Sequence, residues 1–176
     1  MILRPVDLEG AFLVEIEPSE DNRGFYAQSF TAREFEARGL VGSFVEGGIS
    51  HNARRGTLRG MHMQLAPRAQ AKLVRCTNGA IYDVIVDLRR DSPTYTRWVA
   101  VDLTASGRES LYVPEGFAHG FQTLVDGAEV SYQLSDYYDP EAEFGVRWND
   151  PRFGIDWPVD EVVISDRDRS YGDFQD

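Results

Sequence analysis

The stretch AKLVRCTNGAIYDVIVDLR, residues 71–89, decides the fold class. Two apolar segments rich in β-branched residues, 71–76 and 80–89, lie on either side of a short turn sequence. An Asn-Gly pair between apolar segments of this kind is a strong local signal for a β-hairpin. We therefore predict two strands joined as a hairpin, with Asn78-Gly79 as the turn.

Other strand-like segments lie on both sides of this stretch, cut by turn residues at intervals of about 8–12 residues. Repeated short strands of this kind indicate an antiparallel sandwich or barrel, here a jelly roll. We predict an all-β jelly-roll barrel with a few short helices, as a single domain over residues 1–176. The remaining predicted strands are 11–17, 24–30, 96–104, 109–124 with an internal Pro-x-Gly turn, and 128–138.

One helix is predicted at TAREFEARG, residues 31–39. Thr31 can cap its start, Glu34 occupies the capping-box position, and Gly39 can end it. The segment 148–158 has too many turn residues for a long element. We expect it to pack on the barrel as irregular chain.

Composition excludes several classes of partner. The formal net charge of −11 argues against nucleic acid or an anionic membrane, because both favour a basic surface. Cys76 is the only cysteine, so no intrachain disulfide can form. The N-terminal residues resemble no signal or transit peptide, and no apolar run approaches the ~20 residues that span a bilayer. We expect a cytoplasmic protein.

A metal site has little support in the residue spacing. The three histidines are His51, His62 and His119, and Gln64 stands where a His-x-His pair would place a second imidazole. The three rings can still converge in space, but nothing in the sequence indicates it. We expect no metal and no cofactor.

Proton transfer fits the residues better. Histidine is the residue type best suited to act as a base near neutral pH, and His62 lies in RGMHMQ (59–64). Asp168 can orient it if the tail folds back, and Lys72 can stabilise a developing oxyanion. Tyr132 lies on the apolar side of its predicted strand, where its hydroxyl needs a partner. The structural alternatives are a packed histidine, a core tyrosine and a solvent-facing lysine.

Other residues are candidates for binding. His119 is flanked by glycine and aromatic residues in GFAHGF, which suits a pocket wall. Three arginines near turns or strands can hold a phosphate or simply face solvent, namely Arg23, Arg59 and Arg75.

Seven motifs in a fixed order extend over nearly the whole chain. They are DNRGF, LRGMHMQ, AQAKLVRCTNGAIYDVIVDLRRDSPTY, PEGFAHGFQTL, AEVSYQLSDYYDPEAEFGVRWNDP, IDWP and SDRD. With these motifs the chain resembles the dTDP-4-dehydrorhamnose 3,5-epimerase family. The resemblance implies a cofactor-independent, cupin-type jelly roll that forms a homodimer and acts on a nucleotide-linked 4-keto-6-deoxy sugar.

The resemblance also implies residue roles. His62 matches the base, Asp168 its partner, Lys72 the group that stabilises the enolate, and Tyr132 the acid. The matches to substrate contacts are His119 beside the sugar, Arg23 and Arg59 on the diphosphate, Tyr138 stacked on the base, and Glu143 and Arg167 as further contacts.

The chain departs from the family pattern at positions near the nucleotide. Glu46-Gly47-Gly48 stands where Gln-Asp-Asn is usual, and Gln28 where glutamate is usual. Separately, Arg167, one of the further substrate contacts, stands where lysine is common. We hypothesise that the donor nucleotide is not dTDP. Epimerisation at C3, C5 or both is the main functional prediction. A keto-sugar isomerase on another nucleotide sugar and a non-catalytic nucleotide-sugar binding module are the alternatives.

Overall fold

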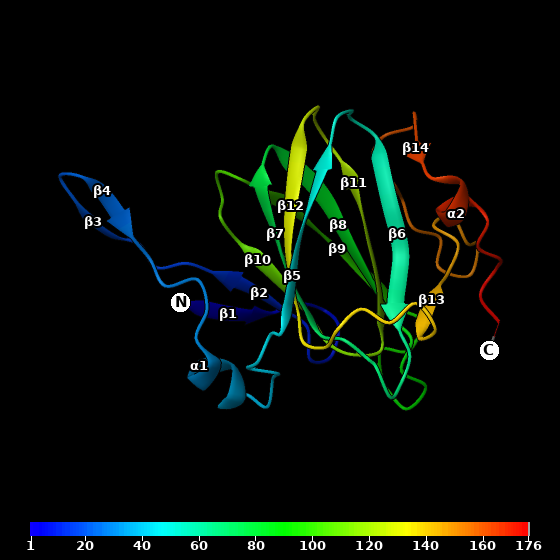
Figure 1. The fold of residues 1–176 in the computed structure, drawn as a ribbon, viewed down its shortest axis with the longest axis horizontal. Helices are drawn as coiled ribbons and strands as arrows, with labels where there is room; N and C mark the ends of the chain where they lie inside the picture. The colour runs from blue at the N-terminus through cyan, green and yellow to red at the C-terminus, as the bar shows by residue number, and fades with distance from the viewer. Residues whose placement is uncertain (176) are drawn as a thin grey trace.

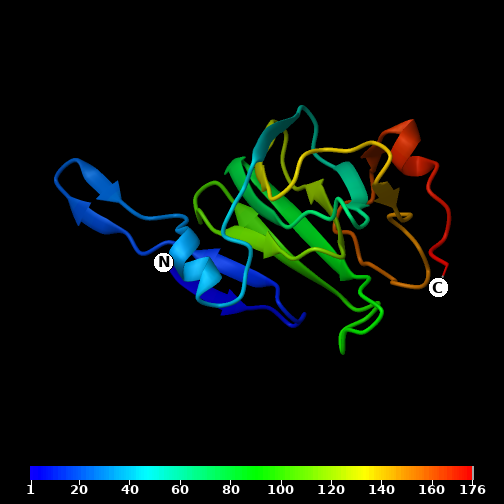
Figure 2. The same cartoon turned by 60° about the horizontal axis from the view of Figure 1, so that its bottom comes forward.

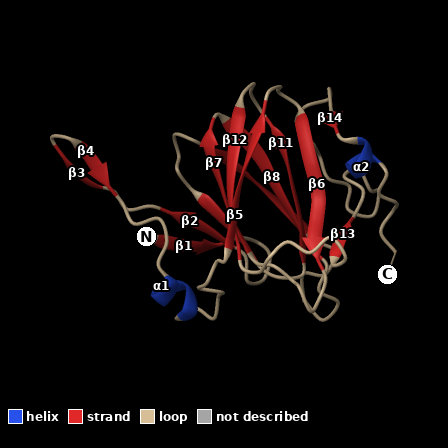
Figure 3. Cartoon of the chain, in the orientation of Figure 1, coloured by secondary structure: helices blue, strands red, loops and turns tan. Residues whose placement is uncertain are grey.

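The structure, a computed structural model, describes residues 1–175 and consists mainly of two facing β-sheets (Figures 1 and 3). The first sheet has the order β1 (Ile2–Pro5), β2 (Phe12–Glu15), β10 (Ser110–Val113), β7 (Lys72–Asn78), β12 (Ala128–Leu134) and β5 (Glu46–Asn52). The second has the order β13 (Glu143–Gly145), β6 (Thr57–Gln64), β11 (Phe117–Thr123), β8 (Ala80–Asp87) and β9 (Trp98–Thr104).

Few elements lie outside these two sheets. The short strand β14 (Val163–Ile164) pairs with β6 in parallel. The described part of the chain also forms the helices α1 (Ala32–Glu36) and α2 (Asp166–Arg169) and a hairpin of β3 (Ser19–Asp21) and β4 (Gly24–Tyr26). In residues 1–175 no helix is long and apolar enough to cross a membrane. The prediction of an all-β jelly roll with a few short helices is confirmed.

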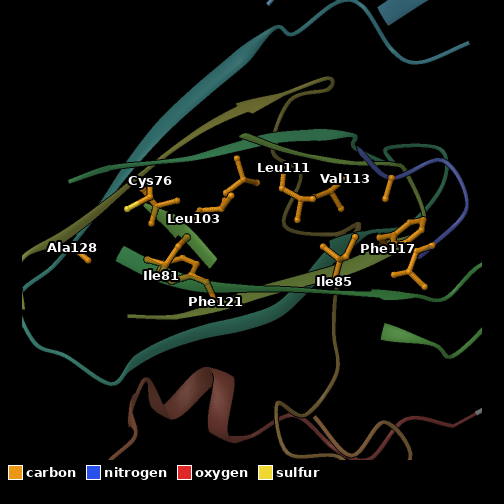
Figure 4. Close-up of a cluster of buried hydrophobic side chains, with 13 residues drawn as sticks. Cys76, Ile81, Ile85, Leu103, Leu111, Val113, Phe117, Phe121 and Ala128 are labelled. Carbon is orange, nitrogen blue, oxygen red and sulfur yellow. The ribbon is translucent and has the colours of Figure 1, made fainter. Parts of the chain in front are cut away.

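The main core fills the space between the two sheets (Figure 4). Alternating residues of the first sheet, such as Leu111 and Val130, face Ile81, Ile85 and Phe121 of the second. All five side chains are buried. Burial of apolar side chains is the main favourable term in folding, so this layer holds the two sheets together.

The predicted hairpin at 71–89 is wrong, although both of its strands exist. β7 pairs with β10 and β12, whereas β8 pairs with β9 and β11 in the opposite sheet. Gly79, with φ of 75°, turns the chain from one layer to the other. An Asn-Gly turn specifies a chain reversal but not the strands that will hydrogen-bond, and here non-local partners prevail.

The predicted helix exists but is shorter, and its expected capping bond is absent. Thr31 is in the N-cap position, yet its side chain makes no capping hydrogen bond. Gly39 ends the turn as predicted: it adopts φ of 72°, and the next N–H, that of Leu40, donates to the Phe35 carbonyl at 3.0 Å. Phe35 is fully buried and packs edge-on against Tyr112 of β10.

Two peripheral segments bear on the site. The β3–β4 hairpin projects away from the two sheets in both views (Figures 1 and 2). At the other end, residues 148–158 are irregular, as predicted, but β13, β14 and α2 all contact β6. The C-terminal segment is therefore attached to the strand that carries His62.

β6 and β11 approach closely at a bulge. His119 pairs with His62 and Phe121 pairs with Arg59, so β6 has one residue more than β11 between these two pairs. Gly60, in the bulge, has φ of 136°, a conformation that favours glycine. A Cβ on Gly60 would lie 2.6 Å from the Cα of Gly120 on the facing strand. The two glycines therefore permit this contact between backbones.

We predict that Gly120→Ala destabilises the fold. The added Cβ would lie 2.6 Å from the Met61 Sδ and 2.8 Å from the Arg59 carbonyl oxygen, and overpacking of this kind costs about 1–3 kcal/mol. Urea denaturation followed by circular dichroism measures the loss. Gly172→Ala is the control, because its Cβ would meet no atom within 4 Å. Equal stability of the two variants would contradict the prediction.

Candidate active site

Two adjoining cavities, of about 310 and 480 Å³, lie between the sheets where β6 and β12 face one another. They share His62, Lys72, Tyr132 and Arg167, so they form one continuous site. The smaller cavity is also lined by Glu46, Gly48, Met63, Gln64, Gln70, Leu134, Tyr138 and Glu143. The larger one adds Ser50, Arg59, His119, Phe121, Ser165 and Asp168.

The bulge in β6 explains why two residues of RGMHMQ face the same cavity. Residues three apart on a regular strand point to opposite faces of the sheet. The extra residue near Gly60 reverses this alternation, so Arg59 and His62 both line the larger cavity. The motif thus places a cation and an imidazole side by side.

His62 is paired with a carboxylate from the C-terminal segment. Its Nε2 lies 2.8 Å from Asp168 Oδ1, and the Gly60 N–H donates to Asp168 Oδ2 at 3.1 Å. Burial raises the pKa of the Asp168 carboxyl, but the hydrogen bond and charge interaction with His62 and the Gly60 N–H outweigh it and leave this pKa below its ordinary value. An ionised Asp168 accepts the Nε2–H, so Nδ1 is the nitrogen free to take a proton.

Lys72 supplies a buried cation to both cavities. Its ammonium donates to the His62 carbonyl oxygen at 3.1 Å. Burial lowers the pKa of Lys72 to about 8, although the negative charge of Asp83 opposes this effect. Such an ammonium is charged at neutral pH and poorly screened by water, which suits it to stabilise an oxyanion.

Tyr132, on β12, lines both cavities from the first sheet, whereas His62 lines them from the second. Burial of its hydroxyl raises the pKa of Tyr132 well above its ordinary value, and the charge of Asp83 adds to this. The phenol therefore keeps its proton across the physiological range. Its ring packs edge-on against His119, with 6.3 Å between ring centroids, and His119 Nε2 lies 2.8 Å from Asp83 Oδ1.

A cluster of polar side chains borders the smaller cavity. Glu143 accepts a hydrogen bond from the Tyr138 hydroxyl at 2.6 Å and another from the Tyr171 hydroxyl at 3.0 Å. The Arg167 guanidinium pairs with the same carboxylate. Glu46 accepts from the Tyr138 backbone N–H at 3.0 Å. These contacts fix Tyr138 and Arg167 at the cavity wall.

Three of the residues expected to bind substrate do not line either cavity. Arg23 lies on the β3–β4 hairpin, where its exposed guanidinium pairs with Asp21. Gln28 is exposed between that hairpin and α1, and Gly47 points away from the cavities because it alternates with Glu46 and Gly48. The other predicted site residues each line one or both cavities: Glu46, Gly48, Arg59, His62, Lys72, His119, Tyr132, Tyr138, Glu143, Arg167 and Asp168.

Sequence reasoning missed two residues of this region. Asp83 is fully buried, and its Oδ2 has no hydrogen-bond partner in residues 1–175. The signal was a single acid inside the apolar segment AIYDVIV, 80–86. Tyr171 gave no signal, because its position follows only from the path of the tail.

The larger cavity is cationic although the chain as a whole is acidic. Arg59, Lys72 and Arg167 face one carboxylate there, that of Asp168, whereas the whole chain carries a net charge of −11. Among the described residues, no group of three or more His, Cys, Asp or Glu side chains is placed to hold a metal ion. The cavity is therefore suited to an anionic group such as a phosphate or a diphosphate.

Known proteins are similar to this chain in both sequence and fold. A family model described as dTDP-4-dehydrorhamnose 3,5-epimerase matches residues 5–176. The dTDP-4-dehydrorhamnose 3,5-epimerase of Methanothermobacter thermautotrophicus is 43% identical over 167 residues, covering 93% of this chain and 89% of that protein. The dTDP-4-dehydrorhamnose 3-epimerase of Streptomyces niveus is 39% identical over 170 residues, covering 96% of this chain and 82% of that protein.

A solved structure extends the likeness to three dimensions. The crystal structure of dTDP-4-dehydrorhamnose 3,5-epimerase from Elizabethkingia anophelis matches with a TM-score of 0.96 and 38% identity, covering 99% of this chain and 96% of that chain. Family model, relatives and fold agree over nearly the whole sequence. The chain belongs to the dTDP-4-dehydrorhamnose 3,5-epimerase family of carbohydrate epimerases.

Proposed function

We propose that this protein inverts C3, C5 or both of a nucleotide-linked 4-keto-6-deoxy sugar by proton transfer through an enolate. The observation that carries the proposal is one continuous cavity, with a His–Asp pair on the side of β6 and a buried ammonium and a protonated phenol on the side of the facing sheet. Family membership supports the same reaction class.

The chemistry assigns each group one step. The C4 ketone acidifies the hydrogens on C3 and C5, and His62 removes one of them while Asp168 holds its ring. Lys72 stabilises the negative oxygen of the enolate. Tyr132 then returns a proton from the opposite face, which inverts the carbon. No redox cofactor takes part.

The phosphates bind at the cationic side of the cavity. Arg59 donates its Nε–H to Asn52 Oδ1 at 2.8 Å, which fixes the guanidinium and leaves its other N–H groups for phosphate oxygens. Arg167 is fixed by Glu143. Anchoring the diphosphate away from the reacting carbon holds the ring between His62 and Tyr132.

The carbon of the sugar that is inverted and the identity of the donor nucleotide depend on different parts of the site. The relatives include proteins named as 3,5-epimerases and one named as a 3-epimerase, so the family is compatible with both outcomes. Those names refer to dTDP sugars. At this site, however, Gly48 leaves open space beside Tyr132, its neighbour across the strand pair, and Glu46 places a carboxylate at the cavity wall. A donor other than dTDP stays our hypothesis.

The first prediction from this proposal concerns solvent exchange. In heavy water, the wild type should place deuterium at C3, C5 or both of a 4-keto-6-deoxy sugar, tested on dTDP, GDP, UDP and CDP and followed by mass spectrometry. His62→Ala should lose labelling by at least about a hundredfold while still binding the nucleotide sugar. Binding by both proteins with labelling by neither would favour a non-catalytic binding module. Fastest labelling of the dTDP sugar would refute the hypothesis of another donor.

The second prediction concerns pH. Because the pKa of Lys72 is lowered to about 8, its ammonium is charged below that pH and loses its proton above it. We expect kcat/KM, which reports the free enzyme, to fall as the pH rises through about 8. Lys72→Met should be slow at every pH and lack this descending limb. A limb that persists in Lys72→Met would show that another group titrates.

We also propose that the protein is a homodimer in which the β3–β4 hairpin of one subunit completes the cavity of the other. Arg23, which the resemblance matches to a diphosphate contact, lies between β3 and β4 and lines neither cavity. The β3–β4 hairpin projects away from the two sheets (Figure 1). The hairpin also exposes Phe25 and Tyr26, which are 44% and 74% accessible. Exposed aromatic side chains of this kind favour burial against a partner.

Mixing two inactive variants tests the dimer. Arg23→Ala keeps an intact cavity, and His62→Ala keeps an intact hairpin. After subunit exchange at equal amounts, half the dimers are mixed and each has one complete site, so about a quarter of wild-type activity should return. A monomer in analytical ultracentrifugation, or no recovery on mixing, would contradict the proposal.

A further inference from the structure

We propose that Tyr171 is a positioning residue for His62. The Tyr171 ring occupies the space left by the missing side chain of Gly145 and holds the His62 imidazole against Asp168. The inference rests on the proposed function, because it gives Tyr171 a task only if His62 is the base. Tyr171 carries no role in the family resemblance and lies in the C-terminal tail.

The first observation is the contact between the two rings. The Tyr171 ring packs edge-on against His62, with 5.9 Å between ring centroids and 72° between ring planes. The His62 side chain is 32% exposed, so burial alone does not fix it. An aromatic ring placed edge-to-face stabilises one orientation of its partner. Asp168 holds His62 through a hydrogen bond at Nε2, and the Tyr171 ring restricts rotation of the imidazole about this hydrogen bond.

The second observation is the seat of the ring. Gly145 on β13 is the cross-strand partner of His62 on β6. A Cβ on Gly145 would lie 2.1 Å from the Tyr171 Cζ and 2.4 Å from two other ring atoms. The missing side chain therefore makes the space that the Tyr171 ring occupies beside the imidazole.

The third observation is the anchor of the hydroxyl. The Tyr171 hydroxyl donates to Glu143 Oε1 at 3.0 Å, and Glu143 also binds Tyr138 and Arg167. The ring is therefore held at one end by Glu143 and packed at its edge against His62. This geometry separates two functions of Tyr171: the hydroxyl acts on the substrate-binding residues and the ring acts on the base.

One short segment provides both supports of His62. The Ser165 Oγ accepts the Asp168 N–H at 3.1 Å and caps α2. Tyr171 follows two residues after the end of α2 at Arg169. Docking of residues 165–171 on β6 thus brings the carboxylate and the ring to the imidazole together.

Kinetics of paired variants test the inference. Tyr171→Ala should lower kcat by about three- to tenfold, since edge-to-face contacts contribute on that scale. Tyr171→Phe keeps the ring and should retain kcat within about twofold. It should raise KM, because Glu143 loses its hydrogen bond from Tyr171 and holds Tyr138 and Arg167 less firmly. Gly145→Ala should lower kcat in the wild type but cause little further loss in Tyr171→Ala, because the ring it displaces is already absent.

Phe174→Ala is the matched control. Phe174 lies in the same tail and packs against Phe153, with 5.5 Å between centroids, so its loss loosens the tail without removing a ring from His62. An unchanged kcat in Tyr171→Ala, an equal loss in Tyr171→Phe, or an equal loss in Phe174→Ala would each overturn the inference.

A measurement without substrate separates this inference from the proposed function. Proton NMR of the substrate-free protein should show faster exchange with water of the His62 Nε2–H in Tyr171→Ala than in the wild type or Tyr171→Phe. Equal exchange in all three proteins would overturn the positioning role. A wild type that catalyses no labelling of any sugar would instead refute the proposed function, whatever the exchange rates.

Discussion

The hydrogen bond between His62 and Asp168 is the interaction on which the rest of the site depends. It joins residues that are 106 positions apart and fixes the C-terminal segment to β6. The same carboxylate accepts the Gly60 N–H, so one side chain orients the imidazole and also satisfies the backbone of the bulge. An ionised, well-bonded Asp168 keeps the imidazole in the tautomer that accepts a proton at Nδ1. Once this pair forms, Arg167, which precedes Asp168 in the sequence, reaches the cavity wall, and Tyr171, three residues after Asp168, packs against His62.

The remaining geometry follows from places where side chains are missing. Gly60 and Gly120 allow β6 and β11 to approach, and the resulting bulge turns Arg59 and His62 to the same face. Gly48 leaves space next to Tyr132, and Gly145 leaves space next to His62. The two sheets then hold the proton-accepting and proton-donating groups in opposite layers, which is the arrangement that inversion of a ring carbon requires.

Local patterns predicted several of the strands, the helix-ending Gly39 and the irregular stretch before the tail, because these depend on neighbours in sequence. They did not predict β1, β5, β13 or β14. They did not predict which strands pair: Asn78-Gly79 reverses the chain, but β7 and β8 find their partners far away. From residue chemistry alone, His62 could be either a catalytic base or a packed structural histidine. Its assignment as the base came from the family resemblance. Asp83 and Tyr171 were missed because their contacts with His119 and His62 depend on tertiary packing. The sequence also could not predict that Arg23 lies outside the cavities, because the order of residues does not show that the β3–β4 hairpin projects away from the sheets.

In the proposed mechanism His62 removes the proton on one face of the sugar ring and Tyr132 returns it on the other. Tyr132→Phe in heavy water tests this most directly, with mass and configuration of the sugar followed together. We predict that the recovered sugar gains deuterium at C3 or C5 without inversion, because His62 still removes a proton and returns a deuteron to the same face. Labelled sugar that is also inverted at the wild-type rate would contradict these roles of His62 and Tyr132, since a single base would then serve both faces.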